Sequence, residues 1–421
     1  MQKLAVKRLL GPLAAVVVGS LAAVLVFELL LRAIGYSAPI WYRPDPQLGW
    51  TLRPHANGWF TQEGRASVRI NAAGLRDRDH PVEKPPDVYR IAVLGDSHAE
   101  AMQVDVRDAF WAVLEAKLTQ CAFKSGMRME VINFGVSGFG TTQEYLMLQS
   151  TAIRYQPDLV LLAFTAGNDV RNNAKRLEPE KVRPFFRLGP HDRLTLDASF
   201  VEDPQFKSRA SYLPEVLRSL SDHWRLLQLA HAAKNALAAS RQPIDAQASD
   251  LRLGPAALAP RRDAEEEGAW SVTERLLARE AGQDLAVLAP PRDAEWEAAW
   301  SLTDRIIEEL SAYAKSHGSR VVLTPITLSV QVRPDRRFRD ELQERLGVAD
   351  LFYPERRMEA LAKRAGIQTI SLAREMQRIA DAENVYFHGF PNSGIGVGHM
   401  NEKGHRVVAD IIARELCESR S

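Results

Sequence analysis

The sequence predicts an α/β protein in which helices cover both faces of a parallel sheet. Apolar runs of strand type recur at about 89–95, 129–134, 158–165, 319–326 and 367–372. Amphipathic helical patterns alternate with these runs, as expected for a parallel sheet covered on both faces. Several of the runs also end in turns rich in glycine and polar residues. In an open parallel sheet, such turns converge beyond the carboxyl ends of the strands, where ligands bind.

The first strand carries the most informative turn. Ile91 to Leu94 runs into Gly95-Asp96-Ser97, and a helical pattern follows through Phe110 to Leu118. This order places a serine hydroxyl at a strand-to-helix turn, beside the backbone N–H groups of the helix start. Activated serines are often held at such a turn, because a helix N-terminus favours developing negative charge. The tripeptide alone is a weak signal, since an ordinary polar turn has the same composition.

Three later turns carry other groups that are useful for acyl transfer. The second strand ends in Val136-Ser137-Gly138, and the third runs into Gly167-Asn168-Asp169. Gly398-His399 precedes an amphipathic helix from about Arg406 to Cys417. With the serine turn, these segments predict that a hydroxyl, a backbone N–H, an amide and an imidazole meet at one end of the sheet.

In these four blocks the chain resembles the SGNH (GDSL-type) hydrolases, a family named after Ser, Gly, Asn and His in this order. The resemblance covers about 86–171 and 298–417 and implies a three-layer α/β/α, flavodoxin-like fold. It implies that Ser97 is the nucleophile and His399 the general base. The backbone N–H of Gly138 and the side-chain amide of Asn168 would form the oxyanion hole with the N–H of Ser97.

The chain departs from the family at one position. The family usually has Asp three residues before the catalytic His, and here that residue is Gly396. The missing carboxylate would orient the imidazole, and replacing it with Asn in a serine protease lowers kcat about 10⁴-fold. Three explanations stay open: a Ser–His dyad oriented by a backbone carbonyl, an acid from elsewhere in the chain, or a degenerate site. Asp169 is a nearby acid, but we expect it to organise its own turn.

The resemblance implies a serine esterase. Its acyl-serine intermediate would pass the acyl group to water or to a sugar hydroxyl. We therefore predict an esterase acting on O-acyl, in particular O-acetyl, esters of envelope or exported glycans. Two alternatives stay open: an O-acyltransferase onto polysaccharide, with a membrane partner donating the acyl group, and a non-catalytic glycan-binding or assembly module on a degenerate hydrolase fold.

The N-terminus predicts a membrane anchor. Lys3, Lys7 and Arg8 precede an uncharged run from Leu9 to Phe27. Nineteen helical residues span about 28 Å, close to the thickness of the bilayer hydrocarbon. Basic residues upstream favour a cytoplasmic N-terminus, and thus a single-pass inner-membrane protein with a periplasmic domain. A cleaved signal peptide is the alternative, but the run is long for one and no small-x-small cleavage site follows it.

Cys121 and Cys417 are the two cysteines of the sequence. In the flavodoxin-like sandwich that the resemblance implies, the first and last helices pack side by side, with these cysteines at matching ends. For a domain outside the cytoplasm we therefore predict a disulfide between them.

The predicted organisation has five parts. They are a cytoplasmic tail and transmembrane anchor (1–37), a β-containing connecting segment (38–85), the first part of the catalytic domain (86–171), a helical insertion (172–297) and the second part of the catalytic domain (298–421).

The insertion carries most of the remaining patterns. An amphipathic helix is expected from Leu213 to Leu237, followed by a Pro/Ala/Ser-rich linker from Ser240 to Pro260. Residues 258–277 and 288–307 are a tandem duplication, with 13 of 20 positions identical. The second copy is predicted to be the helix before the strand at 319–326. The aromatic side chains Phe185, Phe186 and Trp224 could contact substrate, but we expect them to take part in ordinary packing.

Several function classes are excluded or unsupported. The net charge is +1 and the charges are interspersed, which argues against nucleic acid binding. No nucleotide-binding loop occurs, so no cofactor is implied. His399 and His405 are six residues apart and do not share a helical face, so no metal site is predicted. His405 is expected to pack in the last helix behind an Asn401 cap, and His98 to lie beside the nucleophile without acting as base.

Overall fold

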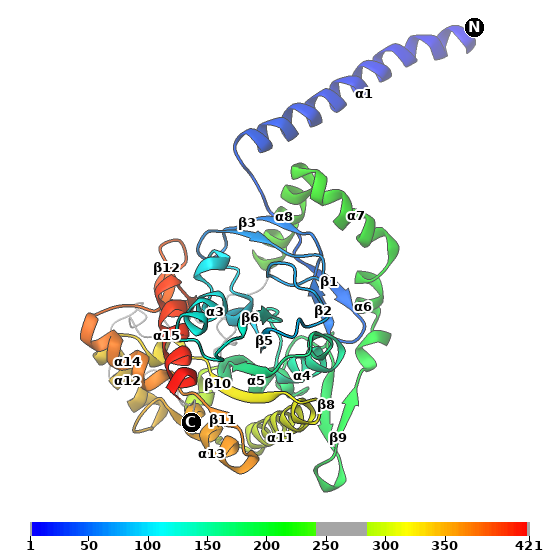
Figure 1. Ribbon diagram of the computed structural model, residues 1–421. Helices are drawn as coiled ribbons and strands as arrows, with labels where there is room; N and C mark the ends of the chain where they lie inside the picture. The colour runs from blue at the N-terminus through cyan, green and yellow to red at the C-terminus, as the bar shows by residue number, and fades with distance from the viewer. Residues whose placement is uncertain (1, 241–283, 419–421) are drawn as a thin grey trace, which may run out of the picture. The chain divides into compact units, whose positions relative to one another are not determined.

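The computed structural model describes residues 2–240 and 284–418 (Figure 1). The chain divides into two compact units. One contains the residues up to Trp41 and the segment that begins at Ser211, and the other contains Tyr42–Ala210 and the chain from 284 onward. Each unit is described separately below.

The larger unit is built on a five-stranded sheet. Its strands are β5 (Val88–Gly95), β6 (Arg128–Asn133), β7 (Leu159–Phe164), β10 (Arg320–Pro325) and β11 (Gln368–Thr369). Their order is β11-β10-β7-β5-β6, and every pairing is parallel. This confirms the predicted doubly wound α/β fold, although the last strand has two residues where the apolar run suggested six. The strand order reverses between β5 and β7, which is where ligands bind in such sheets.

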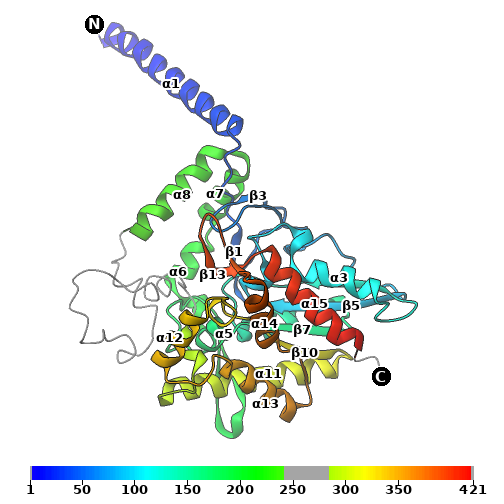
Figure 2. The same cartoon turned by 90° about the vertical axis from the view of Figure 1, so that its left-hand side faces the viewer.

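Helices cover both faces of this sheet (Figures 1 and 2). The helices of the unit are α2 (Ser97–Glu100), α3 (Phe110–Gln120), α4 (Thr141–Ser150), α5 (Ala166–Asn173), α6 (Pro204–Arg209), α11 (Ala294–Ser316), α12 (Arg336–Leu346), α13 (Tyr353–Ala365), α14 (Ala373–Glu383) and α15 (Glu402–Glu418).

The alternation of side chains along β5 divides the core in two. Ile91 and Val93 point into a cluster with apolar residues of α3, α14 and α15. Ala92 and Leu94 point into the opposite cluster, which includes residues of α4, α11 and α13. Both faces are therefore buried, and all eight residues of the strand are buried, as its nearly continuous apolar sequence predicts.

The helical pattern after Ser97 is broken in the structure. It forms the short helix α2, which ends at Ala101 in a left-handed conformation (φ 57°), and α3 begins only at Phe110. The expectation of a helix following the serine directly was therefore right for one turn and wrong beyond it.

Residues 42–85 pack against the sheet. They form two antiparallel hairpins, β1 (Tyr42–Asp45) with β2 (Gly49–Leu52) and β3 (Asn57–Phe60) with β4 (Ala66–Arg69). The stretch that shows strand-like alternation in the sequence is β4, in which buried and exposed residues alternate. This segment lies in the same compact unit as the sheet.

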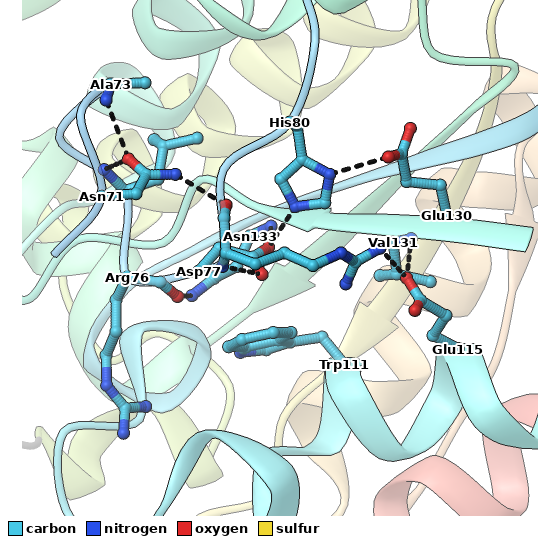
Figure 3. A network of polar contacts seen from close by, with 12 residues as sticks. Asn71, Ala73, Arg76, Asp77, His80, Trp111, Glu115, Glu130, Val131 and Asn133 are labelled. Atoms are coloured by element: carbon cyan, nitrogen blue, oxygen red, sulfur yellow. Dashed lines mark hydrogen bonds and ion pairs between the residues drawn. The ribbon is translucent and has the colours of Figure 1, made fainter. Parts of the chain in front are cut away.

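Buried polar contacts attach the segment to the sheet (Figure 3). The Asp77 carboxylate accepts the backbone N–H of Asn133 at 3.0 Å and contacts His80, which also contacts Glu130 at 2.9 Å. Burial lowers the pKa of His80, but hydrogen bonds to Asp77 and Glu130 outweigh it and raise the pKa overall. Arg76 is fully buried and donates to the carbonyls of Glu100 and Val104, directly behind α2.

Two further hairpins complete the unit: β8 (Phe185–Leu188) with β9 (Leu194–Asp197), and β12 (His388–Phe390) with β13 (Gly394–Met400). Phe185 and Phe186 are buried, as expected. The second copy of the duplication forms the start of α11, whose first N–H groups are capped by Asp293. The first copy, and the linker beyond Ser240, lie outside the described residues.

Cys121 and Cys417 form a disulfide, with Cα atoms 6.4 Å apart, which confirms the predicted pairing. The bond joins the C-terminal ends of α3 and α15, two neighbouring helices on the same face of the sheet. It therefore links residues separated by 296 positions in the chain.

The smaller unit consists of α1 (Gln2–Ala33), α7 (Tyr212–His223) and α8 (Arg225–Ser240). Within the described part of the chain, Ala14–Ala33 is the helical stretch long and apolar enough to cross a membrane, with a mean hydropathy of 2.5. A signal sequence near the N-terminus can meet the same criteria of length and hydropathy. The single helix predicted from Leu213 to Leu237 is instead two helices, because the chain is extended at Trp224 (φ −128°, ψ 109°).

Candidate active site

Ser97 lies at the carboxyl end of β5, as the first residue of α2, and is 6% exposed. The Asp96 side chain caps this helix by accepting the backbone N–H of His98 at 2.9 Å. The Oγ atom of Ser97 lies 2.8 Å from Nε2 of His399. A serine and an imidazole that are 302 residues apart in the sequence therefore form a hydrogen bond.

The second nitrogen of His399 contacts an acid. Its Nδ1 hydrogen-bonds to Oε2 of Glu63, a residue of the segment before the sheet. The other carboxylate oxygen, Oε1, accepts the backbone N–H of His399 at 2.8 Å. Glu63 therefore holds both the ring and the backbone of the histidine, and the contacts Ser97–His399–Glu63 run in series as nucleophile, base and acid do in serine hydrolases.

Glycines in β13 make room for this acid and exclude the usual one. At Gly398 (φ 78°), a Cβ atom would lie 2.3 Å from Oε1 of Glu63. At Gly396 (φ 81°), three residues before His399, a Cβ atom would lie 2.7 Å from the Tyr386 ring. The carbonyl of Gly396 accepts a hydrogen bond from Arg333 at 2.9 Å instead. The local backbone therefore favours glycine at both positions and an acid from another segment.

The loop that carries Glu63 is tied to the β12–β13 hairpin by Asn392. The side-chain oxygen of Asn392 accepts the backbone N–H of Gly64 at 2.9 Å. Its amide donates to the carbonyls of Thr61 and Gly64, at 3.2 and 2.9 Å. Because Glu63 lies between these two residues, one asparagine fixes the acid relative to the strand that bears His399.

Charge supports the pairing of Glu63 with His399. Burial lowers the pKa of His399, but the hydrogen bond and charge of Glu63, with smaller contributions from Asp96 and Glu100, raise it above its ordinary value. Burial raises the pKa of Glu63, but its contacts with His399 outweigh this and lower the pKa overall. The acid is therefore ionised at neutral pH and can accept the Nδ1 proton.

Two histidines near His399 have lowered pKa values, in contrast to His399 itself. Burial, and then the charge of a neighbouring histidine, lower the pKa values of His98 and His388 to about 3. The His98 ring lies 5.1 Å from the His399 ring and is 1% exposed. With so low a pKa, His98 is a much weaker proton acceptor than His399, which agrees with the expectation that it is not the base.

Gly138 lies in the turn after β6, in a left-handed conformation (φ 77°). Trp50, from β2, covers this turn: its indole N–H donates to the carbonyl of Ser137 at 2.9 Å. The carboxyl group of Glu100 accepts from Tyr42 at 3.0 and 2.9 Å, and burial raises the pKa of Glu100 to about 7. The segment before the sheet therefore also supports the turn that carries the predicted oxyanion-hole glycine.

Asn168 lies in the first turn of α5, after β7. Its side-chain amide donates to Oδ2 of Asp96 at 2.6 Å, while Oδ1 of Asp96 accepts from the Thr165 hydroxyl at 3.1 Å. The amide has a second N–H, which an oxyanion could accept. Asp96 therefore joins the nucleophile turn to the asparagine turn, and it is a positioning residue that the motif contained but whose role was not predicted.

The structure also places the remaining candidates. Asp169 accepts the backbone N–H of Thr165 at 2.9 Å, so it organises its own turn as expected. Asn401 caps α15 by accepting from Lys403 and Gly404, which starts the helix earlier than its apolar pattern suggested. His405 is buried and stacks on Phe110, in agreement with a packing role.

Sequence reasoning did not identify Glu63. It lies 336 residues before its histidine partner, in a segment that matches no family block. The sequence marks Glu63 only by its local position: it precedes Gly64, which has a left-handed backbone (φ 67°) in the short turn between β3 and β4. Such turns are common, so the acid becomes visible only through its contacts.

No metal site accompanies this arrangement. Across residues 2–240 and 284–418, no group of three or more His, Cys, Asp and Glu side chains is placed to hold a metal ion.

Comparisons with known proteins add structural neighbours. No family model matches the sequence, and no curated protein matches it. The chain is similar to an α/β hydrolase enzyme from the metagenome of Lake Arreo, Spain (12% identity, 79% of this chain and 96% of that chain, TM-score 0.35). It is also similar to the acetyl xylan esterase AlAXEase (10% identity, 77% and 98%, TM-score 0.34). A third neighbour is a GDSL-like lipase from Bacteroides thetaiotaomicron (12% identity, 78% and 88%, TM-score 0.30). Likeness at this level carries no weight for the function, which is argued below from the site itself.

Proposed function

We propose that this chain is a serine esterase of the SGNH type, with Ser97 as nucleophile, His399 as general base and Glu63 as the third member of the triad. The observation that carries the proposal is the continuous series of contacts from Oγ of Ser97 through both ring nitrogens of His399 to the Glu63 carboxylate. The raised pKa of His399 and the lowered pKa of Glu63 support these roles.

The mechanism follows from the geometry. Nε2 of His399 accepts the proton of Ser97 as Oγ forms a bond to the ester carbonyl carbon. The N–H groups of Ser97 and Gly138 and the amide of Asn168 stabilise the oxyanion, and each such donor is worth about 10²–10³ in rate. The protonated imidazole then gives its proton to the leaving alcohol oxygen as the C–O bond breaks. Water hydrolyses the acyl-serine by the same steps, and Oγ recovers its proton from His399.

Glu63 favours catalysis over a binding role. The non-catalytic alternative depended on the missing acid at Gly396, and a carboxylate from another segment occupies the position that the base requires. A site that had lost its function would not be expected to retain a substitute acid held at both oxygens.

We place the enzyme at the outer face of the inner membrane, anchored by α1. The disulfide supports an oxidising compartment. Contacts of α1 support an anchor rather than a cleaved signal: the carboxylate of Glu28 accepts backbone N–H groups of Arg225 and Leu226 at 3.0 and 2.9 Å. A segment that is removed would not carry the cap of a helix in the mature protein. O-acyl, in particular O-acetyl, esters of envelope or exported glycans are the substrates we propose for this location.

The test is the burst of p-nitrophenol from p-nitrophenyl acetate, measured with the full chain in detergent beside Ser97→Ala. A burst near one equivalent that is absent from the variant supports acylation of Ser97. Equal, burst-free traces from both proteins would contradict the proposal. If turnover after the burst is slow and a glycan hydroxyl accelerates it, the acyl group is transferred to sugar rather than to water.

A further inference from the structure

The helix α7 exposes an apolar face. Leu213, Leu217, Leu220 and Trp224 follow one another at intervals of four, three and four residues, so they form one stripe along the helix and its end. These side chains are between 40% and 65% exposed. Four large apolar side chains in one exposed stripe indicate a surface that contacts something other than water.

The remaining sides of α7 differ from this stripe. Ser221 is buried, and its carbonyl accepts the side-chain amide of Gln228, a residue of α8, at 2.8 Å. Arg218 pairs with Glu215 at 2.7 Å on the polar side. The helix therefore packs on α8 through one side and carries charge on another, while the described residues of this unit leave the apolar stripe uncovered.

The junction between α7 and α8 is fastened to the end of α1. Arg32 donates to the carbonyl of His223, the last residue of α7, at 2.6 Å. Glu28 caps the first two residues of α8, and Arg32 pairs with Glu28 at 2.8 Å. An ionisable residue in a membrane helix is costly unless it is paired. The partners of Glu28 are the N-terminus of α8 and Arg32. The junction between α7 and α8 is therefore held beside the last turns of α1.

For an α1 that spans the membrane as proposed, Glu28 lies close to the edge of the bilayer. Glu28 lies five residues before Ala33, the end of the apolar stretch, which corresponds to about 7.5 Å along a helix. Amphipathic helices at membrane surfaces bury their apolar face about 5–10 Å into the boundary of headgroups and acyl chains. Trp224 lies at the junction, and tryptophan prefers this interface. The same end of α1 exposes the apolar side chains of Leu29 and Leu30.

We propose that α7 lies in the membrane interface, with Leu213, Leu217, Leu220 and Trp224 in contact with lipid at the level where α1 leaves the bilayer. The inference rests on the membrane anchor of the proposed function. It makes α7 a second membrane contact of the chain, and it corrects the expectation that Trp224 packs internally, since this side chain is 40% exposed.

The test uses the full chain in phospholipid nanodiscs, with the disulfide oxidised and an environment-sensitive NBD fluorophore on an introduced cysteine. Leu217→Cys and Leu220→Cys place the probe in the stripe, and Ser219→Cys, an exposed position on the polar side, is the matched control. Val18→Cys, exposed within α1, reports the anchor. Each sample is compared with and without lipid that carries a nitroxide on carbon 5 of one acyl chain, and with iodide in the buffer.

We expect nitroxide lipid to quench the probes at 217 and 220 at least twofold more than the probe at 219, which iodide quenches instead. If iodide reaches position 217 as readily as 219 while the probe at 18 is quenched by the nitroxide, the anchor stands and the inference is wrong. Shielding of 217 from both quenchers would show that protein, a partner or a second copy, covers the stripe, which also overturns it. If nitroxide lipid does not quench the probe at position 18, α1 does not span the bilayer, and both the proposed anchor and this inference are wrong. The burst assay tests the catalytic proposal independently.

Discussion

In the proposed mechanism, the basicity of His399 depends on one carboxylate, that of Glu63. Glu63 binds the ring and the backbone of His399 with its two oxygens, and it is part of the reason that the pKa of the histidine is raised. An amide at this position can still accept one hydrogen bond but carries no charge to stabilise the imidazolium. The contribution of Glu63 should therefore be measurable in the rate and in the pH dependence separately.

Glu63→Gln is expected to lower kcat for p-nitrophenyl acetate by about 10²–10⁴-fold, because loss of the triad acid in serine hydrolases has effects of this size. KM should change much less, since the residue does not contact substrate in the proposed mechanism. Steady-state kinetics check this, and Gln62→Ala, a change at the exposed neighbouring residue, is the control that should leave kcat within twofold.

The pH profile tests the same contact by another route. His399 acts as base only when neutral, so activity falls as pH decreases through its pKa. Because that pKa is raised, the acid limb of kcat/KM should lie above pH 6.5, the ordinary value for histidine. In Glu63→Gln the largest raising contribution is lost while burial still lowers the pKa, so the limb should move to lower pH. An unmoved limb would show that Glu63 does not set the pKa of the base.

At the scale of elements, the site is assembled by segments that lie far apart in sequence. The β3–β4 turn supplies the acid, β2 supplies Trp50, and the β12–β13 hairpin positions both acid and base. The backbone of β13 explains why residue 396, three positions before His399, is glycine rather than Asp: it has a positive φ and lies against the Tyr386 ring.

Restoring the family's residue should therefore fail. In the double variant Glu63→Gln/Gly396→Asp, we expect no recovery of kcat relative to Glu63→Gln, because a side chain at 396 strains the backbone and meets the Tyr386 ring. The free energy of unfolding, measured by urea denaturation, should fall in the double variant. Recovery of activity would mean that the hairpin can adopt the family's geometry.

Asn392→Ala tests whether the hairpin positions the acid. The change removes hydrogen bonds to Thr61 and Gly64 on both sides of Glu63. We expect kcat to decrease about 10- to 100-fold with little change in KM, since a displacement of a catalytic group by about 1 Å can cost about 100-fold in rate. The acid limb of the pH profile should shift partway toward that of Glu63→Gln, and a loss of stability alone would leave the limb in place.

Much of the architecture could be predicted from the sequence, because it follows from short-range patterns. The four main strands have apolar runs of about their own length, and Ser97, Gly138 and Asn168 follow three of them. His399 lies instead within β13, just before α15. Glu63 could not be predicted, since its role depends on a contact between distant segments that leaves no periodic or spaced signal. The break at Trp224 was missed for a similar reason: the cap of α8 comes from Glu28, almost 200 residues earlier.

At the scale of the whole molecule, the disulfide closes a very long loop. A crosslink between residues 296 positions apart restricts the unfolded chain strongly, and typical disulfides contribute about 2–4 kcal/mol, rising with loop length. Cys121→Ser/Cys417→Ser should lose roughly 3–5 kcal/mol of unfolding free energy. Urea denaturation with and without reductant measures it: reductant should destabilise the original protein and leave the double variant unchanged. The acylation burst should survive, because the bond lies at the far end of α15 from His399.

The position of Glu63 has a practical consequence for reading genomes. A search that judges catalytic competence by an acid three residues before the histidine would classify this protein as an inactive homologue. A truncated form that begins at residue 86, where the recognisable blocks start, would retain serine, glycine, asparagine and histidine and yet lack the group that makes the histidine a strong base. In the proposed mechanism, the catalytic unit therefore begins well upstream of the sequence motifs, because it includes Glu63.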